Sequence, residues 1–148
     1  MINEDLMRSA IAVAKSALKT ADVPVGALIV DGENNIIATG YNEREAHQDP
    51  TAHAEIVAIR RAAQKLGTWR LAECRLVVTL EPCAMCAGAI AQSRIGILVF
   101  GAWDEKAGAV GSVWDVLRDP RAIHKMEVIG GVLEAECAEL LTNFFREQ

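Results

Sequence analysis

The pattern that most limits what this chain can fold into is a pair of cysteines that closely follows a proline. Cys83 and Cys86 come after Pro82, which itself follows the short apolar run 76–80. Such a run is typical of a buried strand, and proline suits the first turn of a helix. We therefore expect a helix from residue 83 to about 93 that begins where a strand ends. Both sulfurs then lie on one face of its first turn.

The first turn of a helix also suits metal binding by these cysteines. The positive end of the helix dipole favours thiolate over thiol, and thiolate is the form that binds metal. Further upstream, His53-Ala54-Glu55 supplies an imidazole and a carboxylate. Two sulfurs and one imidazole are a typical ligand set for zinc. We predict that His53, Cys83 and Cys86 bind one zinc ion per chain.

The spacing of His53 and Glu55 raises a geometric question. We expect a helix to begin near Asp49-Pro50 and to end at Gly67, which places both residues in its first turns. Residues two apart on a regular helix point in different directions. They can still share a site that lies beyond the tip of the helix. Open α/β sheets place sites in that region, outside the carboxyl ends of the strands.

Three protein ligands leave one position on a tetrahedral zinc ion for water, which is typical of a catalytic site. Zinc lowers the pKa of such a water to about 7, so hydroxide is available at neutral pH. Glu55 is the candidate catalytic residue. It can take a proton from the water, protonate a ring nitrogen and pass a proton to a departing amine.

Other interpretations of these residues remain open at this stage. A Cys-x-x-Cys pair can be a redox motif, and Cys74 or Cys137 can complete a purely structural zinc site. Otherwise these two cysteines are small buried hydrophobic residues. A zinc-stabilised binding protein without catalysis is a further alternative. His47 and His124 are expected in solvated loops and not as ligands.

The rest of the chain predicts an α/β fold. We expect one domain over residues 1–148, with a mixed central sheet of about five strands and helices on both faces. Apolar residues almost all round the helix 83–93 predict that it is buried, and that it joins parallel strands by a right-handed crossover. The expected strands span 25–30, 36–39, 76–80, 95–100 and 126–129, the first two forming a hairpin. The other expected elements are helices over 4–19, 112–117 and 134–146, and a loop over 41–49.

Charge and hydropathy exclude some functions. Fifteen Lys and Arg against 20 Asp and Glu give a net charge of -5, which argues against broad, sequence-independent binding to nucleic acid. No apolar run approaches the roughly 20 residues that span a bilayer. Residues 1–20 contain acidic residues and lysines and do not match a signal peptide. We therefore expect a cytoplasmic protein with no membrane partner and with reduced thiols.

The H-x-E and P-C-x-x-C segments together match the signature of zinc nucleobase deaminases. Longer stretches resemble the bacterial tRNA-specific adenosine deaminase family along nearly the whole chain. They span 23–27, 49–55, 79–89, 93–96 and 144–146. The resemblance implies a three-layer αβα, cytidine-deaminase-like fold and conversion of the wobble adenosine of an arginine tRNA anticodon to inosine. It also implies a homodimer, with the tRNA anticodon stem-loop near the subunit boundary.

The resemblance also implies further site residues. Asn42 and the backbone N–H of Ala54 are expected to hold the target base, Asp104 to contact the backbone of the flipped nucleotide, and Phe145 to lie near the loop. Considered without the family, Asn42 is a turn former, Asp104 a solvated acid and Phe145 part of the core. If the chain binds tRNA as the resemblance implies, the cations expected to contact phosphates are Arg94, Lys106, Arg118, Arg121 and Lys125.

A single-stranded anticodon loop suits a negatively charged protein, because its bases unstack at low cost and few phosphates need to be bound. The same zinc chemistry would also serve a deaminase of a free base or nucleoside, such as guanine, cytosine or cytidine. The zinc motif does not separate these two functions, and only the longer stretches of resemblance favour tRNA.

Overall fold

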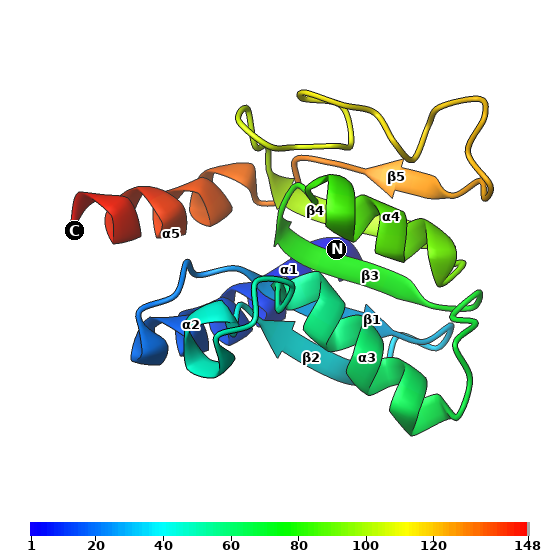
Figure 1. The fold of residues 1–148 in the computed structure, drawn as a ribbon, viewed down its shortest axis with the longest axis horizontal. Coiled ribbons are helices and arrows are strands. Elements are labelled where there is room, and N and C mark those ends of the chain that lie inside the picture. Colours follow the sequence, from blue (N-terminus) through cyan, green and yellow to red (C-terminus); the bar gives the residue numbers. More distant parts are fainter. Residues whose placement is uncertain (148) are drawn as a thin grey trace.

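A computed structural model describes residues 1–147 as a five-stranded sheet with helices on both faces (Figure 1). The strands lie in the order β2-β1-β3-β4-β5. Strand β1 is antiparallel to β2 and β3, whereas β3, β4 and β5 are parallel. The predicted mixed sheet is therefore confirmed. The strands span β1 Gly26–Val30, β2 Ile36–Tyr41, β3 Arg75–Leu80, β4 Ile97–Ala102 and β5 Glu127–Ile129.

Each face of the sheet has its own helices and its own hydrophobic core. Helix α3 (Ala54–Leu66) packs on β1 and β2, and α4 (Ala84–Gln92) lies beside it. Helices α1 (Ile2–Ala14) and α5 (Glu134–Arg146) cover the opposite face. One core contains Ala58 and Ile90 from α3 and α4, and the other contains Met7 and Cys137 from α1 and α5. The structure thus has the expected three layers.

The predicted hairpin is present, and a helix joins two parallel strands as expected. Strands β1 and β2 pair in antiparallel register, and α4 joins the parallel strands β3 and β4. The prediction that α4 is buried almost all round is wrong. Cys86, Ala87 and Ile90 face the sheet, whereas Met85 on the outer side is 39% exposed. Only one side of this short helix is buried, so its outer apolar residues stay exposed among residues 1–147.

Two predicted boundaries before α3 are wrong. The expected loop over 41–49 contains a short helix, α2 (Arg44–His47), and α3 begins at Ala54 instead of near Asp49. Asp49 does not cap a helix. Its Oδ1 accepts hydrogen bonds from the N–H and the hydroxyl of Thr51 at 2.9 and 2.7 Å. This local turn ends before His53, which has an extended backbone and caps α3.

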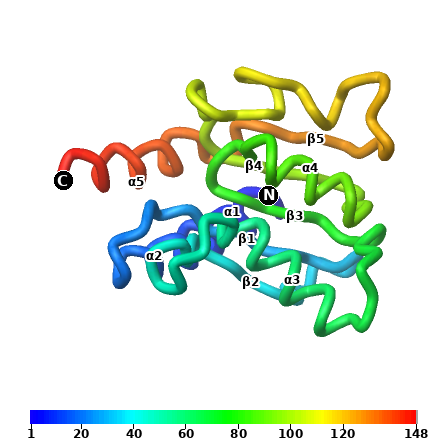
Figure 2. Tube along the Cα trace, viewed as in Figure 1, coloured from blue at the N-terminus to red at the C-terminus, as the bar shows by residue number. Residues whose placement is uncertain are grey.

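The segment between β4 and β5 is irregular and runs along the edge of the sheet (Figure 2). The predicted helix over 112–117 is absent there. The Val110 and Ser112 N–H groups bond the Glu81 carboxylate, and Gly111 has a φ of +126°, outside the helical range. These bonds use donors that a helix would direct along its own axis. Local hydrophobic spacing could not reveal a partner 29 residues away.

The predicted N-terminal helix is present at the expected position, but as an α-helix it is shorter than expected. Helix α1 ends at Ala14, and a 3-10 helix, η1 (Lys15–Thr20), continues it, where one helix over 4–19 was expected. At the other end, α5 matches the predicted helix 134–146. Its first turns pack on the sheet through buried Cys137, and its last turns extend beyond the sheet (Figure 1). Within residues 1–147, none of the helices combines the length and the hydropathy that crossing a membrane requires.

Candidate metal centre and active site

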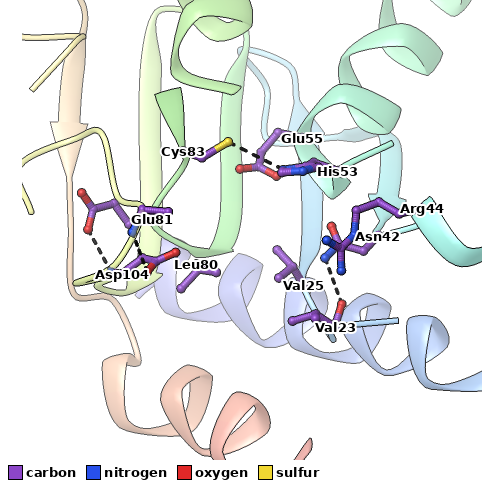
Figure 3. A pocket seen from close by; sticks show the side chains of 11 residues that line it. Val23, Val25, Asn42, Arg44, His53, Glu55, Leu80, Glu81, Cys83 and Asp104 are labelled. Atoms are coloured by element: carbon purple, nitrogen blue, oxygen red, sulfur yellow. Dashed lines mark hydrogen bonds between the residues drawn. The ribbon is translucent and has the colours of Figure 1, made fainter. Parts of the chain in front are cut away.

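The three predicted zinc ligands come together at the carboxyl edge of the parallel strands. His53 Nδ1 lies 3.7 Å from Cys83 Sγ and 3.6 Å from Cys86 Sγ. The three ligand atoms lie within 4.8 Å of one another, although His53 is 30 residues away from the first cysteine in the sequence. Figure 3 shows Cys83, His53 and Glu55 pointing toward one another. The predicted cluster is therefore present.

Two helix N-termini build the cluster. His53 is the N-cap of α3 and Cys83 is the N-cap of α4, both with extended backbone. A cap residue lies outside the helical repeat, so its side chain need not follow helical directions. His53 and Glu55 can therefore face the same site although they are two residues apart. The two helices start at the edge where β3 ends, which confirms the predicted location beyond the strands.

The spacing of the ligand atoms fits a tetrahedral zinc ion. Zn–S and Zn–N bonds of about 2.3 and 2.05 Å imply S···N separations of about 3.6 Å, and the observed separations are 3.6 and 3.7 Å. Within residues 1–147, Cys74 and Cys137 lie outside this cluster as buried free thiols. The alternative of a fourth cysteine ligand is therefore excluded. Three protein ligands leave room for one small ligand.

Burial and hydrogen bonds set the protonation of the site. A hydrogen bond with Cys86, assisted by His53, lowers the pKa of the Cys83 thiol to about 3. The hydrogen bond with Cys83 also raises the pKa of His53 above its usual value. Burial raises the pKa of Glu55 to about 7. This residue is only 4% exposed. A carboxyl group with such a pKa can both take and give a proton near neutral pH.

A pocket of about 160 Å³ opens onto this cluster. Apolar side chains from three segments form its walls, and Arg44 is the one Lys or Arg that lines it within residues 1–147. A volume of this size suits a flat, ring-sized group and not a large ligand. The complete lining is Val23, Val25, Asn42, Arg44, His53, Glu55, Leu80, Glu81, Cys83, Asp104 and Ala107.

Asn42 lines this pocket and contacts the fully buried residue Ala54. The Ala54 N–H donates to Asn42 Oδ1 at 2.9 Å. Asn42 Nδ2 donates to the Val23 carbonyl at 3.0 Å, a bond that Figure 3 shows. An asparagine amide retains a second N–H and a second lone pair after these two bonds. Asn42 therefore keeps hydrogen-bonding capacity toward a ligand. The Ala54 N–H already has a protein partner, and its predicted contact with substrate stays a prediction.

A second, wider groove of about 670 Å³ adjoins the pocket. Asp104 lines both, and Phe145 from α5 lines the groove. Phe145 is 58% exposed and packs edge-on against Phe144 at 5.2 Å, so it is not a core residue. Lys106 also lines the groove. The structure thus brings Asp104 and Phe145 to one continuous surface beside the zinc ligands.

Sequence reasoning missed two charged residues of the site. Arg44 lines the pocket, but the acidic neighbours Glu43 and Glu45 hid its importance in the sequence. Glu81 is 2% exposed and accepts hydrogen bonds from Asp104, Val110 and Ser112. An acidic residue between an apolar strand and Pro82 was the available signal for Glu81.

The five cations expected to bind phosphate are mostly occupied elsewhere. Arg94 lies over Trp69 at the far end of α4, 5.8 Å from the ring centre. Arg118 and Arg121 form ion pairs with Asp115 and Asp119. Lys106 is the member of this set that lines the groove beside the site. Lys125 donates to the Pro120 carbonyl. Position distinguishes Lys106 and the missed Arg44 from this set: Lys106 lines the groove, and Arg44, although it is paired with Asp22, lines the pocket.

Known proteins resemble this chain in both sequence and fold. The cytidine and deoxycytidylate deaminase zinc-binding region matches residues 1–102. The tRNA-specific adenosine deaminase of Haemophilus influenzae is 47% identical over 146 residues, which span 99% of this chain and 84% of that protein. The tRNA-specific adenosine deaminase of Bacillus subtilis is 49% identical over 146 residues, 98% of this chain and 89% of that protein.

Solved structures agree with these sequence matches. A structure from a study of A-to-I editing by tRNA:A34 deaminases has a TM-score of 0.87 and 44% identity, over 91% of this chain and 97% of that one. The guanine deaminase of Nitrosomonas europaea has a TM-score of 0.80 but only 26% identity, over 95% of this chain and 83% of that one. Both the identity and the TM-score are thus higher for the tRNA deaminase structure than for the guanine deaminase.

Proposed function

Because this chain belongs to the cytidine and deoxycytidylate deaminase family, we propose that it converts adenosine to inosine at the wobble position of a tRNA anticodon, with an arginine tRNA as the expected substrate. The observation that carries this proposal is the joint presence of the zinc-ligand cluster and of relatives that are 42–49% identical over at least 95% of the chain. Those relatives bear the name tRNA-specific adenosine deaminase.

The reaction consumes water and releases ammonia. His53, Cys83 and Cys86 would hold a zinc ion, which when bound would make hydroxide available at neutral pH by lowering the pKa of water to about 7. Glu55 takes the proton released when water attacks C6 of the purine, and it delivers that proton to N1. Glu55 then carries the proton of the new C6 hydroxyl group to the amino group, the C6–N bond breaks, and ammonia leaves a C6 carbonyl behind. The pKa of about 7 at Glu55 supports this exchange.

Asn42 is proposed to orient the target nucleoside. Asn42 lines the pocket, and its amide keeps one N–H and one lone pair beyond the bonds with Val23 and Ala54. The two bonds that Asn42 makes with Val23 and Ala54 fix its side chain, so binding of a substrate costs little of its conformational entropy. We propose that the Ala54 N–H mainly holds the Asn42 side chain in place. It would contact the base only while it is also bonded to Asn42.

The groove beside the pocket is proposed to bind the rest of the anticodon loop. Phe145 and Trp103 expose aromatic surface there, at 58% and 44%, and unstacked bases bind such surfaces. Lys106 in the groove and Arg44 in the pocket provide positive charge for phosphates. Few phosphate contacts are enough in a single-stranded loop, which agrees with the net charge of -5.

A homodimer in the cytoplasm completes the proposal. The outer side of α4 exposes Met85 and leaves the small residues Gly88 and Ala89 half-buried. Small residues let a second helix approach closely, and an uncovered apolar face is typical of an interface. Light scattering of the purified protein tests this directly. A mass of twice 16.0 kDa is expected, and a mass of one chain would contradict the dimer.

One assay separates the tRNA function from its alternative. The protein is incubated with an anticodon stem-loop of an arginine tRNA, and separately with guanine, cytosine and cytidine. We expect inosine in the RNA and no turnover of the free compounds. A metal-free sample of the same protein is the control and is expected to be inactive. Turnover of a free base together with unchanged RNA would overturn the proposal.

A further inference from the structure

Glu81 is a buried carboxylate that the deamination chemistry does not use. It lies between the end of β3 and Cys83, and it is 2% exposed. Its own N–H donates to the Ala102 carbonyl at 2.8 Å, so its backbone continues the pairing of β3 with β4. Burying a carboxylate is costly unless hydrogen bonds satisfy it. The partners of Glu81 therefore indicate what this charge does.

Among residues 1–147, the donors to the Glu81 carboxylate all come from one loop, residues 104–112. The Asp104 N–H bonds Oε1 at 3.0 Å, and the Val110 and Ser112 N–H groups bond Oε2 at 2.9 and 3.1 Å. The Ser112 hydroxyl donates to Oε1 as well. Three backbone donors and one hydroxyl thus surround one side chain, as in an anion-binding turn. The charge makes each bond stronger than a neutral one.

The same loop contacts the start of α4 at a second point. Gly108 forms a bridge with Cys83, and the Ala109 N–H donates to the Pro82 carbonyl at 2.8 Å. A Cβ at Gly108 would lie 2.4 Å from the Glu81 carboxyl group, so only glycine fits there. The loop is thereby wrapped around Glu81 and attached to a zinc-ligand residue.

This attachment determines where Asp104 lies. Asp104 Oδ1 accepts the Lys106 and Ala107 N–H groups at 3.1 and 3.2 Å, and within residues 1–147 its Oδ2 has no such bond. The Asp104 backbone is held by Glu81, and its side chain lines the pocket (Figure 3). We propose that Glu81 is a positioning residue, which places Asp104 and its loop relative to the zinc ligands for RNA binding. This inference rests on the proposed function.

Hydrogen exchange of the zinc-loaded protein tests the attachment without any RNA. The variant Glu81→Gln replaces one acceptor oxygen with an NH₂ group that would face N–H donors. We expect the Val110 and Ser112 amides to exchange about tenfold faster or more in this variant. Glu43→Gln is the matched control, because Glu43 is also buried but is bound by Arg61, outside the loop. Unchanged exchange in Glu81→Gln would overturn the inference.

Kinetics on the stem-loop tests the consequence for substrate. We expect Glu81→Gln to keep one zinc per chain and to raise KM about tenfold, with a smaller change in kcat. In an Asp104→Asn background the same change should raise KM less than about twofold, because it acts through Asp104. If the two effects multiply instead, or if zinc is lost, Glu81 has only a general structural role.

A milder variant keeps the test valid if Glu81→Gln does not fold. Ser112→Ala removes only the hydroxyl donor to the same carboxylate, and we expect about a threefold rise in KM with the same dependence on Asp104. Effects of Ser112→Ala and Asp104→Asn on KM that multiply would again contradict the inference. If wild type leaves the stem-loop unchanged while the exchange result holds, the proposed function fails and the attachment by Glu81 stands.

Discussion

Arg44 binds Asp22 at the mouth of the site pocket, through Nε at 3.1 Å and Nη2 at 2.8 Å to the same carboxylate oxygen. The Asp22 side chain is fully buried, whereas that of Arg44 is 38% exposed. Asp22 also accepts the Val23 and Glu45 N–H groups. It therefore joins the segment before β1 to the start of α2, and both segments reach the pocket through Val23 and Arg44.

The Asp22 carboxylate is expected to make stability depend on acid pH. Burial alone would raise the pKa of Asp22, but hydrogen bonds from Glu45 and Arg44 outweigh burial and lower it. A pKa lowered in the folded state adds stability above the unfolded value of about 3.9, and this stability is lost as pH falls through the folded value. We expect Asp22→Asn to lower the free energy of unfolding by about 2 kcal/mol at pH 7.

Denaturant unfolding of wild type and Asp22→Asn at several pH values checks this prediction. The difference between the two proteins should begin to shrink below about pH 4, where Asp22 is protonated in the unfolded chain but is still ionised in the folded one, and it should vanish once the pH falls below the lowered pKa of folded Asp22. Losses that both proteins share, such as protonation of the zinc ligands, cancel in the difference. A gap that stays constant or widens toward low pH would show that the Asp22 charge does not stabilise the fold.

Arg44 is expected to contribute positive charge to RNA binding. Each phosphate contact to a single strand adds about 0.7 to the slope of log affinity against log salt. We expect Arg44→Ala to lower kcat/KM on the stem-loop about tenfold at low salt and to flatten the salt slope by about 0.7. Arg8→Ala is the control, since Arg8 pairs with Asp5 on α1, across the sheet. A lower activity with an unchanged slope would mean that Arg44 only holds Asp22.

The zinc ligands were predictable because their chemistry is local in the sequence. Cys83 and Cys86 share one helix turn, and Pro82 marks where that helix begins. His53 needed only the assumption that two helices start at one edge of a parallel sheet. The correct α5 bounds and the five strands also follow from periodicity within short segments. Each of these features depends on residues that lie close together in the sequence, so a sequence pattern can predict it.

The remaining features depend on partners far away in the sequence. The loop 104–112 takes its shape from Glu81, 23 to 31 residues earlier, so a helical pattern over 112–117 was misleading. Arg44 reaches the pocket because Asp22 holds it, 22 residues earlier. The outer side of α4 is exposed because no segment within residues 1–147 covers it. Periodicity predicts which residues avoid water, but it does not say which surface will cover them.

The cysteines provide a matched test of the zinc site. We expect Cys83→Ala and Cys86→Ala to lose both zinc and deamination, because two remaining ligands bind zinc weakly. Cys137→Ala is the control, since this thiol is also buried but lies outside the ligand cluster. Metal analysis should find one zinc per chain in wild type and in Cys137→Ala. Full zinc retention in Cys83→Ala or Cys86→Ala would contradict the assigned ligand set.

Glu55 allows catalysis to be separated from metal binding. Glu55→Ala removes the proposed proton carrier and none of the three zinc ligands, so zinc content and folding should persist. We expect deamination of the stem-loop to fall about 10⁴-fold, near the upper end for loss of a general acid–base group. Zinc analysis, circular dichroism and single-turnover inosine formation are measured on the same preparation. Activity within tenfold of wild type, with zinc present, would refute the assignment of proton transfer to this carboxylate and require another carrier in the pocket.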